Sequence, residues 1–211
     1  MAWYDLFSTF YDGSVEFVYR SVRPQVAAEL QLQPGDHVLD LACGTGPNHP
    51  HLMQAITDSG KLFGVDFSEG MLRRAKKAGE KNGWTNLYPL QRDARELTIA
   101  DLEEASGGPV HLDAILVTLG LSVIPDWETV LRNTFGLLKP GGRYVIFDVF
   151  AQRWVPQSWL VKHLAQADLY RESWKLLEEL SDSFSFQFLP GSPHIHGGRP
   201  FLATGCRAVA P

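Results

Sequence analysis

Short apolar runs alternate along this chain with segments that carry helical spacing. The apolar runs lie near 37–42, 61–66, 86–91 and 112–118, and each is predicted to be a strand. The last run is apolar at nearly every position, which is typical of a strand buried on both faces. Helices are predicted between the runs, near 49–58, from Ser68 to Gly83, and near 126–138. This alternation of strands and helices predicts an α/β protein built on a mostly parallel sheet.

The last third of the chain predicts further elements. A fifth strand is expected from Arg143 to Val149, after a stop at Lys139-Pro140-Gly141-Gly142. A longer helical region is expected over 156–180, and two strands near 183–189 and 200–208 close the chain.

The first strand leads into the most informative segment, Val38-Leu39-Asp40-Leu41-Ala42-Cys43-Gly44-Thr45-Gly46. Its glycines allow a ligand to approach the backbone closely, and the N–H groups that open the next helix face that ligand. Two more acids follow: Asp66 ends the second strand and Asp93 comes after the third. All three acids lie at carboxyl ends of predicted strands, where open α/β sheets bind their ligands.

This set of residues resembles the class I, Rossmann-like methyltransferases that depend on S-adenosylmethionine, over residues about 36–150. The family pattern is acidic-x-Gly-x-Gly-x-Gly, and Ala42 replaces its first glycine here. The resemblance implies a seven-stranded, mostly parallel sheet of order 3-2-1-4-5-7-6 with helices on both faces. It also implies S-adenosylmethionine as cofactor, with S-adenosylhomocysteine as the product. The implied cofactor-binding residues are Asp40, Ala42, Gly44, Thr45, Gly46, Asp66, Phe67, Met71, Asp93, Ala94 and Thr118.

Each of the three acids has a distinct expected role. Asp40 would serve the ammonium of the methionine portion, directly or through water. Asp66 would accept hydrogen bonds from the ribose diol, although an acid at a helix N-terminus is the simpler alternative. Asp93 would accept from the adenine amino group, although a surface-turn acid would look the same, and the Ala94 N–H would reach a ring nitrogen.

Two apolar residues near these acids can be assigned either to the ligand site or to the core. Phe67 and Met71 could sandwich the adenine, but both could be core residues, and for Met71 the core is at least as good an interpretation. Thr118 would lie near the methionine portion because it ends the fourth strand.

Two other function classes share parts of this pattern. A nicotinamide or flavin dehydrogenase has the same glycine turn and ribose acid, but its G-x-G-x-x-G fingerprint needs a third glycine. The loop here reads Gly44-Thr45-Gly46-Pro47-Asn48-His49, which lacks it. A binding protein that kept the fold and lost catalysis stays open, although the intact acids argue against it.

Composition narrows the partners and the compartment. The chain has 211 residues, and we expect one methyltransferase domain over 1–211: an N-terminal helical lid (1–35), a cofactor-binding core (36–150), and a substrate-side helix with the last strands (151–211). A net charge of −5 argues against a nucleic-acid partner. Two cysteines and no apolar run of about 18 residues predict a cytoplasmic protein without a disulfide framework or a transmembrane segment. His194 and His196 make only a weak metal signal, so no metal is expected.

The methyl acceptor depends on the two ends of the chain. Seven aromatic residues fall among the first 20 positions, which predicts a lid over the site, a peripheral membrane contact or a docked helix, and the lid is preferred. The segment 120–127 resembles a loop of bacterial enzymes that N-methylate lipid head groups, whereas quinone-ring C-methyltransferases share the Asp-Leu-Ala-Cys-Gly-Thr-Gly loop. The favoured function is therefore methyl transfer to a small or lipid-like acceptor, foremost an amine nitrogen of a lipid head group. C-methylation of a quinone-type ring, or methylation of another small metabolite, is the alternative. Candidate catalytic residues are Tyr11, His49 and Tyr4, and the oligomeric state is left open.

Overall fold

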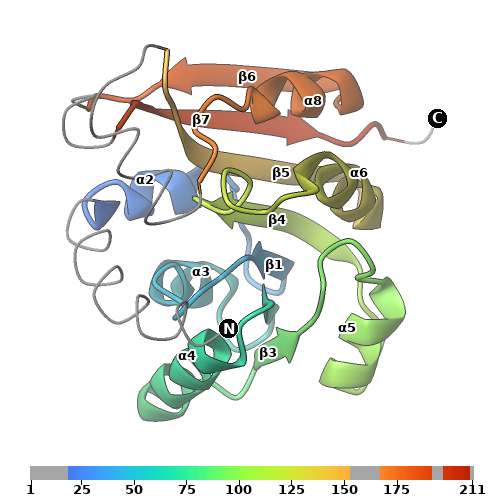
Figure 1. Ribbon diagram of the computed structural model, residues 1–211. Coiled ribbons are helices and arrows are strands. Elements are labelled where there is room, and N and C mark those ends of the chain that lie inside the picture. The colour runs from blue at the N-terminus through green and yellow to red at the C-terminus, as the bar shows by residue number, and fades with distance from the viewer. Residues whose placement is uncertain (1–18, 153–166, 192–196, 210–211) are drawn as a thin grey trace.

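The structure, a computed structural model, describes residues 19–152, 167–191 and 197–209 (Figure 1). These residues form a seven-stranded sheet of order β3-β2-β1-β4-β5-β7-β6, which confirms the predicted order. The strands from β3 to β5 are parallel, and β7 runs antiparallel to both β5 and β6. Their bounds are β1 His37–Leu41, β2 Lys61–Asp66, β3 Leu87–Gln91, β4 Leu112–Thr118, β5 Leu138–Phe150, β6 Ser183–Phe188 and β7 Arg199–Cys206.

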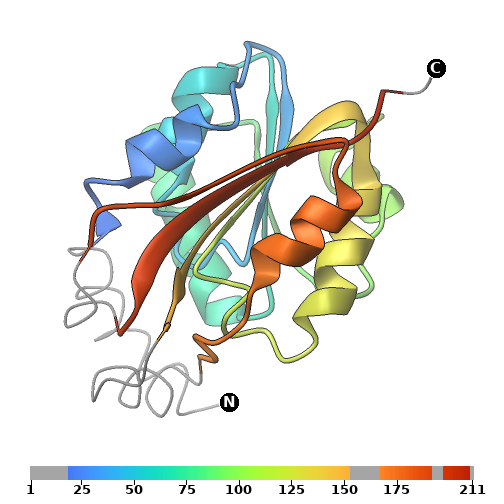
Figure 2. The same ribbon diagram turned by 90° about the horizontal axis from the view of Figure 1, so that it is seen from above.

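Helices cover both faces of the sheet, as predicted (Figure 2). One face carries α2 Arg23–Ala28, α3 His49–Ile56 and α4 Glu69–Asn82, and the other carries α5 Ile99–Ser106, α6 Trp127–Leu137 and α8 Ser173–Leu180. Adjacent strand residues feed opposite cores because side chains alternate along a strand. Val38 packs in the core that includes Leu52 of α3, whereas Leu39 packs in the core that includes Leu131 of α6.

Local capping explains where two helices begin and end. The Ser68 hydroxyl accepts the Met71 N–H at 3.3 Å, and Gly83 adopts a left-handed φ of 72°, so α4 has the predicted bounds. Helix α5 was not predicted. The sequence feature that could have located this helix is a capping box, in which the side chains of Thr98 and Asp101 each accept the backbone N–H of the other residue.

Two predicted boundaries were wrong. Strand β5 begins at Leu138 instead of Arg143, because Leu138 pairs with Leu112 and the Gly141 N–H donates to the Arg207 carbonyl at 2.9 Å. The helix predicted over 156–180 is, among the described residues, confined to Ser173–Leu180. Residues 167–172 are not helical: the Asp168 N–H donates to the Ser122 carbonyl at 2.8 Å, which holds this segment against the loop after β4.

No helix within the described ranges is both long and apolar enough to cross a bilayer.

Candidate functional site

The loop between β1 and α3 makes a turn with repeated left-handed backbone angles. Ala42, Gly44 and Gly46 have φ of 53°, 57° and 79°. The two glycines are required for different reasons. A Cβ on Gly46 would lie 2.3 Å from Nδ1 of His49, whereas a Cβ on Gly44 would meet no atom of the described residues within 4 Å. Gly46 is therefore needed for packing inside the protein, and Gly44 leaves one side of the loop backbone open to a ligand.

Asp66 joins this loop to the end of β2. Its carboxylate accepts the Gly44 N–H at 2.9 Å through Oδ2 and the Ser68 N–H at 2.8 Å through Oδ1. Burial raises the pKa of Asp66, and the two N–H donors act against that rise. Each carboxylate oxygen has a second lone pair, so the ionised side chain can still accept from a diol. The neighbouring Phe67 side chain is 69% exposed, which leaves its ring free to stack on a flat ligand.

Asp40 is completely buried at the end of β1 and belongs to a polar network. The Asn48 amide nitrogen lies 3.3 Å from Asp40 Oδ1 and donates to Thr118 Oγ1 at 2.9 Å. Arg23 of α2 donates to the Asn48 amide oxygen at 2.8 Å. Burial raises the pKa of Asp40 to about 7, although the Asn48 hydrogen bond and the Arg23 charge both lower it. The network thus links three elements: the carboxyl end of β1, the carboxyl end of β4, and helix α2.

His49, a candidate catalytic residue, lies beneath the loop with 1% of its surface exposed. Its ring packs between Gly46 and Gly64. A Cβ added to Gly64 would lie 3.2 Å from Cε1 and Nε2 of this ring. Nε2 is 3.4 Å from Asp40 Oδ2, but neither ring nitrogen makes an aligned hydrogen bond to the described residues. Burial lowers the pKa of His49 to about 4, so the ring is neutral and this contact is not an ion pair at neutral pH. The geometry favours support of the loop over contact with an acceptor, and the catalytic role stays untested.

Asp93 follows β3 and pairs with Arg95. The Arg95 side chain donates through Nε to Asp93 Oδ1 at 3.0 Å, and its backbone N–H donates to the same oxygen at 3.0 Å. These hydrogen bonds lower the pKa of Asp93. An adenine amino group would have to share this carboxylate with Arg95, so the predicted role of Asp93 stays a prediction. Ala94 is adjacent, with its carbonyl bonded to the Asn133 amide at 3.0 Å.

A second buried acid holds the loop that follows β4. Asp148 of β5 accepts the Ser122 N–H at 3.0 Å, and burial raises its pKa to about 6. Arg171 donates to the carbonyls of Leu121 and Ile124 in the same loop. The loop next to Thr118 is therefore tied both to β5 and to the segment that precedes α8.

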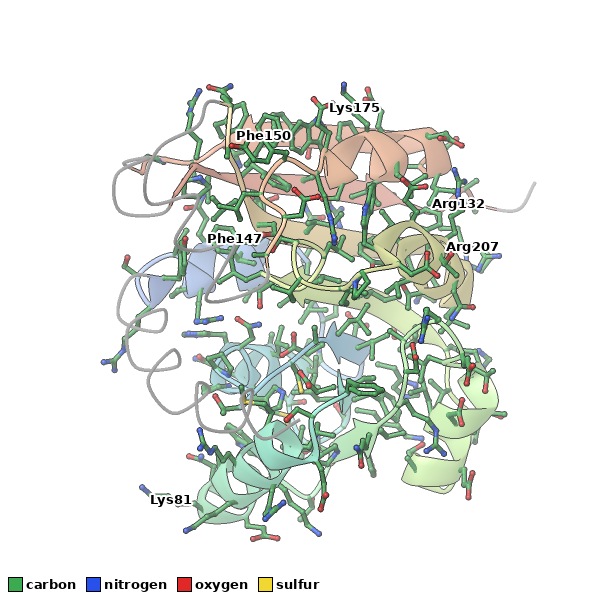
Figure 3. The ribbon with its side chains drawn as sticks, viewed as in Figure 1. Lys81, Arg132, Phe147, Phe150, Lys175 and Arg207 are labelled. Atoms are coloured by element: carbon green, nitrogen blue, oxygen red, sulfur yellow. The ribbon has the colours of Figure 1, made fainter. Side chains whose placement is uncertain are left out.

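Beyond this loop, aromatic rings gather at the carboxyl end of β5. The Phe150 ring, labelled in Figure 3, has its centroid 4.8 Å from that of Trp174. The Trp174 centroid lies 4.9 Å from that of Phe186. Phe147, three residues earlier, contacts the Tyr19 ring at 5.4 Å on the α2 side of the sheet. The end of β5 thus has aromatic side chains on both of its faces.

The structure gathers the predicted loop residues, Asp40, Asp66 and Thr118 at the carboxyl ends of β1, β2 and β4. Tyr4, Tyr11, His194 and His196 lie outside the described residues, and the described ranges contain no group of three or more His, Cys, Asp or Glu side chains suited to a metal. The sequence interpretation missed Arg23 and Asn48. Asn48 stood inside the quoted loop, but Arg23 lies 25 positions before it and had no local signal.

Comparison with known proteins adds the family. The profile of the ubiE/COQ5 methyltransferase family matches residues 16–161. A demethylmenaquinone methyltransferase of Oceanobacillus iheyensis is 32% identical over 130 residues, covering 62% of this chain and 51% of that protein. A demethylmenaquinone methyltransferase of Lactococcus lactis subsp. lactis is 39% identical over 114 residues, covering 54% of this chain and 42% of that protein. The chain thus spans about half the length of these curated relatives.

Solved structures support the fold. A methyltransferase from Haloferax volcanii, solved with the Trm112 methyltransferase activator, superposes with a TM-score of 0.76 at 17% identity over 97% of both chains. An N-methyltransferase from Bradyrhizobium japonicum, solved with S-adenosyl-L-homocysteine, superposes with a TM-score of 0.68 at 16% identity. The superposition covers 89% of this chain and 86% of that protein's chain. At these identities the likeness concerns the fold alone. The family match over most of the described core, together with the loop and its acids, shows that the chain belongs to the ubiE/COQ5 methyltransferase family.

Proposed function

We propose that the protein transfers the methyl group of S-adenosylmethionine to a ring carbon of a quinol-type small molecule. The observation that carries this proposal is the family match over residues 16–161, with curated relatives that are named demethylmenaquinone methyltransferases. These relatives favour the quinone-ring alternative over N-methylation of a lipid head group, which was the first expectation and receives no support from them.

The loop and its acids fit the cofactor. Asp66 would hold the ribose diol, the open side of Gly44 would admit the ligand against the backbone, and Asp40 would attract the ammonium of the methionine portion. The buried, partly ionised Asp40 suits a cation better than a pyrophosphate, which would be repelled by a carboxylate in this position. When bound, S-adenosylmethionine supplies an electrophilic methyl group on a sulfonium.

The acceptor side would be the carboxyl end of β4. Thr118 ends this strand, and the following loop is held in place by Asp148 and Arg171. A rigid wall of this kind can fix the distance and angle at which a flat ring meets the methyl group, which is the main demand of methyl transfer. A ring carbon becomes nucleophilic when a ring hydroxyl loses its proton, so a base is required. Tyr11, Tyr4 and His49 remain the candidates, and His49 is the least suited because it is buried and its pKa is about 4.

Turnover on a defined panel tests the proposal. The purified protein is incubated with S-adenosylmethionine and, in separate reactions, a short-chain reduced naphthoquinone, a phosphatidylethanolamine dispersion and a simple amine. We expect the mass of one added methyl group on the quinol alone, located on carbon by fragmentation. Methylation of the amine or lipid with none on the quinol would refute the acceptor class. Calorimetric titration with S-adenosylhomocysteine and with NAD tests the cofactor independently, because only the first is expected to bind.

A further inference from the structure

We propose that Arg23 is a positioning residue of the cofactor site, which sets the direction of the Asn48 amide and thereby keeps Asp40 a charged acceptor for the ammonium of S-adenosylmethionine. This inference rests on the proposed function, since it assumes that this cofactor binds at the loop.

The first step is the orientation of the Asn48 amide. The two ends of an asparagine amide differ in chemistry, because one accepts and the other donates. Arg23 is buried, with 6% of its surface exposed, and its guanidinium can only donate. Its Nη1 lies 2.8 Å from the Asn48 side chain, so the atom that faces it must be the oxygen. The guanidinium therefore decides which way the amide points.

The second step is what the opposite end of the amide does. With its oxygen on Arg23, Asn48 presents its nitrogen to Thr118 Oγ1 at 2.9 Å and to Asp40 Oδ1 at 3.3 Å. A reversed amide would place an acceptor against the Asp40 carboxylate, and two acceptors without a proton between them repel. Asp40 would then favour its protonated, uncharged form, which attracts an ammonium far less.

The third step is the sensitivity of Asp40 to this change. Asp40 is fully buried, and its pKa of about 7 places it between its two forms near neutral pH. Arg23 from α2 and Asn48 from the start of α3 favour the carboxylate, and Asp66 at the end of β2 opposes it. His49 of α3 and Cys43 in the loop contribute no charge, since burial lowers the pKa of the imidazole and raises that of the thiol. Among the described residues, Arg23 is thus a cation whose charge helps to keep Asp40 ionised.

Arg23→Met tests the proposal, with Arg20→Met as the matched control because Arg20 lies three residues earlier and is exposed. Two ligands are titrated by calorimetry between about pH 6 and pH 9, a window around the pKa of Asp40. S-adenosylhomocysteine carries the amino acid end, and 5′-methylthioadenosine carries the nucleoside without it. We expect affinity of the unchanged protein for S-adenosylhomocysteine to rise as the pH passes about 7. In Arg23→Met this rise should move to higher pH, with roughly fivefold weaker binding at neutral pH, because an increase of about one unit in pKa lowers the ionised fraction of Asp40 there from about one half to about one tenth. Binding of 5′-methylthioadenosine should be unchanged.

The outcomes separate the two proposals. If the unchanged protein binds neither ligand, the proposed cofactor is wrong. If it binds both and Arg23→Met weakens them equally with no shift in pH dependence, the cofactor stands and the positioning role of Arg23 is refuted. Should Arg23→Met fail to fold, Arg23→Gln decides: it keeps a hydrogen-bond donor but not the positive charge that lowers the pKa of Asp40, so a smaller shift in the same direction supports the role, and an unshifted profile refutes it.

Discussion

Gly44→Ala isolates the approach of a ligand to the loop from the stability of the loop itself. The added Cβ meets no atom of the described part of the chain within 4 Å, so the backbone angle, with φ of 57°, is what resists the change there. An alanine in this left-handed region costs about 1 kcal/mol relative to glycine. Unfolding by urea should therefore show a small loss of stability and a protein that stays folded.

A matched control has the same backbone cost at a distance from the site. Gly83 ends α4 with φ of 72°, and a Cβ there also meets no atom within 4 Å among the residues that the structure describes. Gly83→Ala should lose the same amount of stability, about 1 kcal/mol. Both variants thus start from equal stability, and any difference in ligand binding must arise at the loop.

The expected difference is in affinity for S-adenosylhomocysteine. The Cβ of Gly44→Ala would project into the space that the ligand is proposed to fill, and overpacking of this kind costs about 1–3 kcal/mol. Calorimetric titration should therefore show binding about 5-fold to 150-fold weaker for Gly44→Ala and unchanged for Gly83→Ala. Equal affinity in the two variants would show that no ligand reaches this side of Gly44, and the proposed cofactor loop would be wrong.

Three further variants test the same loop from other sides. Asp66→Ala should stay folded by circular dichroism but lose about 2–3 kcal/mol of binding free energy for S-adenosylhomocysteine, as expected for hydrogen bonds to a charged acceptor; unchanged affinity would remove Asp66 from the site. Ala42→Gly should raise the free energy of unfolding by up to about 1 kcal/mol, because Ala42 has φ of 53°, and a lower urea midpoint would contradict that reasoning. Gly46→Ala should destabilise the protein, since its Cβ would lie 2.3 Å from His49, and this loss should be smaller in a chain that already carries His49→Ala. Equal losses from Gly46→Ala with and without His49→Ala would place the strain elsewhere.

Most of the fold could be predicted because its signals are local. The strand at 112–118 is apolar at nearly every position, and Ser68 and Gly83 mark the ends of a helix by their own chemistry. The helix prediction is wrong over 167–172 because the backbone partners of this segment are distant in sequence. The Asp168 N–H donates to the Ser122 carbonyl, 46 positions earlier. No pattern within a short window contains that information.

The candidate site likewise has features that local sequence signals predict and features that depend on contacts between distant residues. The positions of Asp40 and Asp66 at the carboxyl ends of β1 and β2 could be predicted because each acid follows an apolar run, and their roles toward a ligand stay predictions. The direction of the Asn48 amide depends on Arg23, and that contact forms only when α2 packs against α3 and the sheet. The strained φ of Ala42 could not be foreseen either, because alanine is rarely found in that conformation.

The two N–H bonds to Asp66 also have a consequence for the thermodynamics of binding. The carboxylate is anchored by the protein's own backbone, by the Gly44 N–H at 2.9 Å in the loop after β1 and by the Ser68 N–H at 2.8 Å after β2. A side chain already confined to one rotamer does not lose that freedom when a ligand arrives, which saves about 0.5–1.5 kcal/mol for each immobilised side chain. A ligand that bonds Asp66 therefore meets a preorganised acceptor, and the entropy of ordering it was already lost when the chain folded.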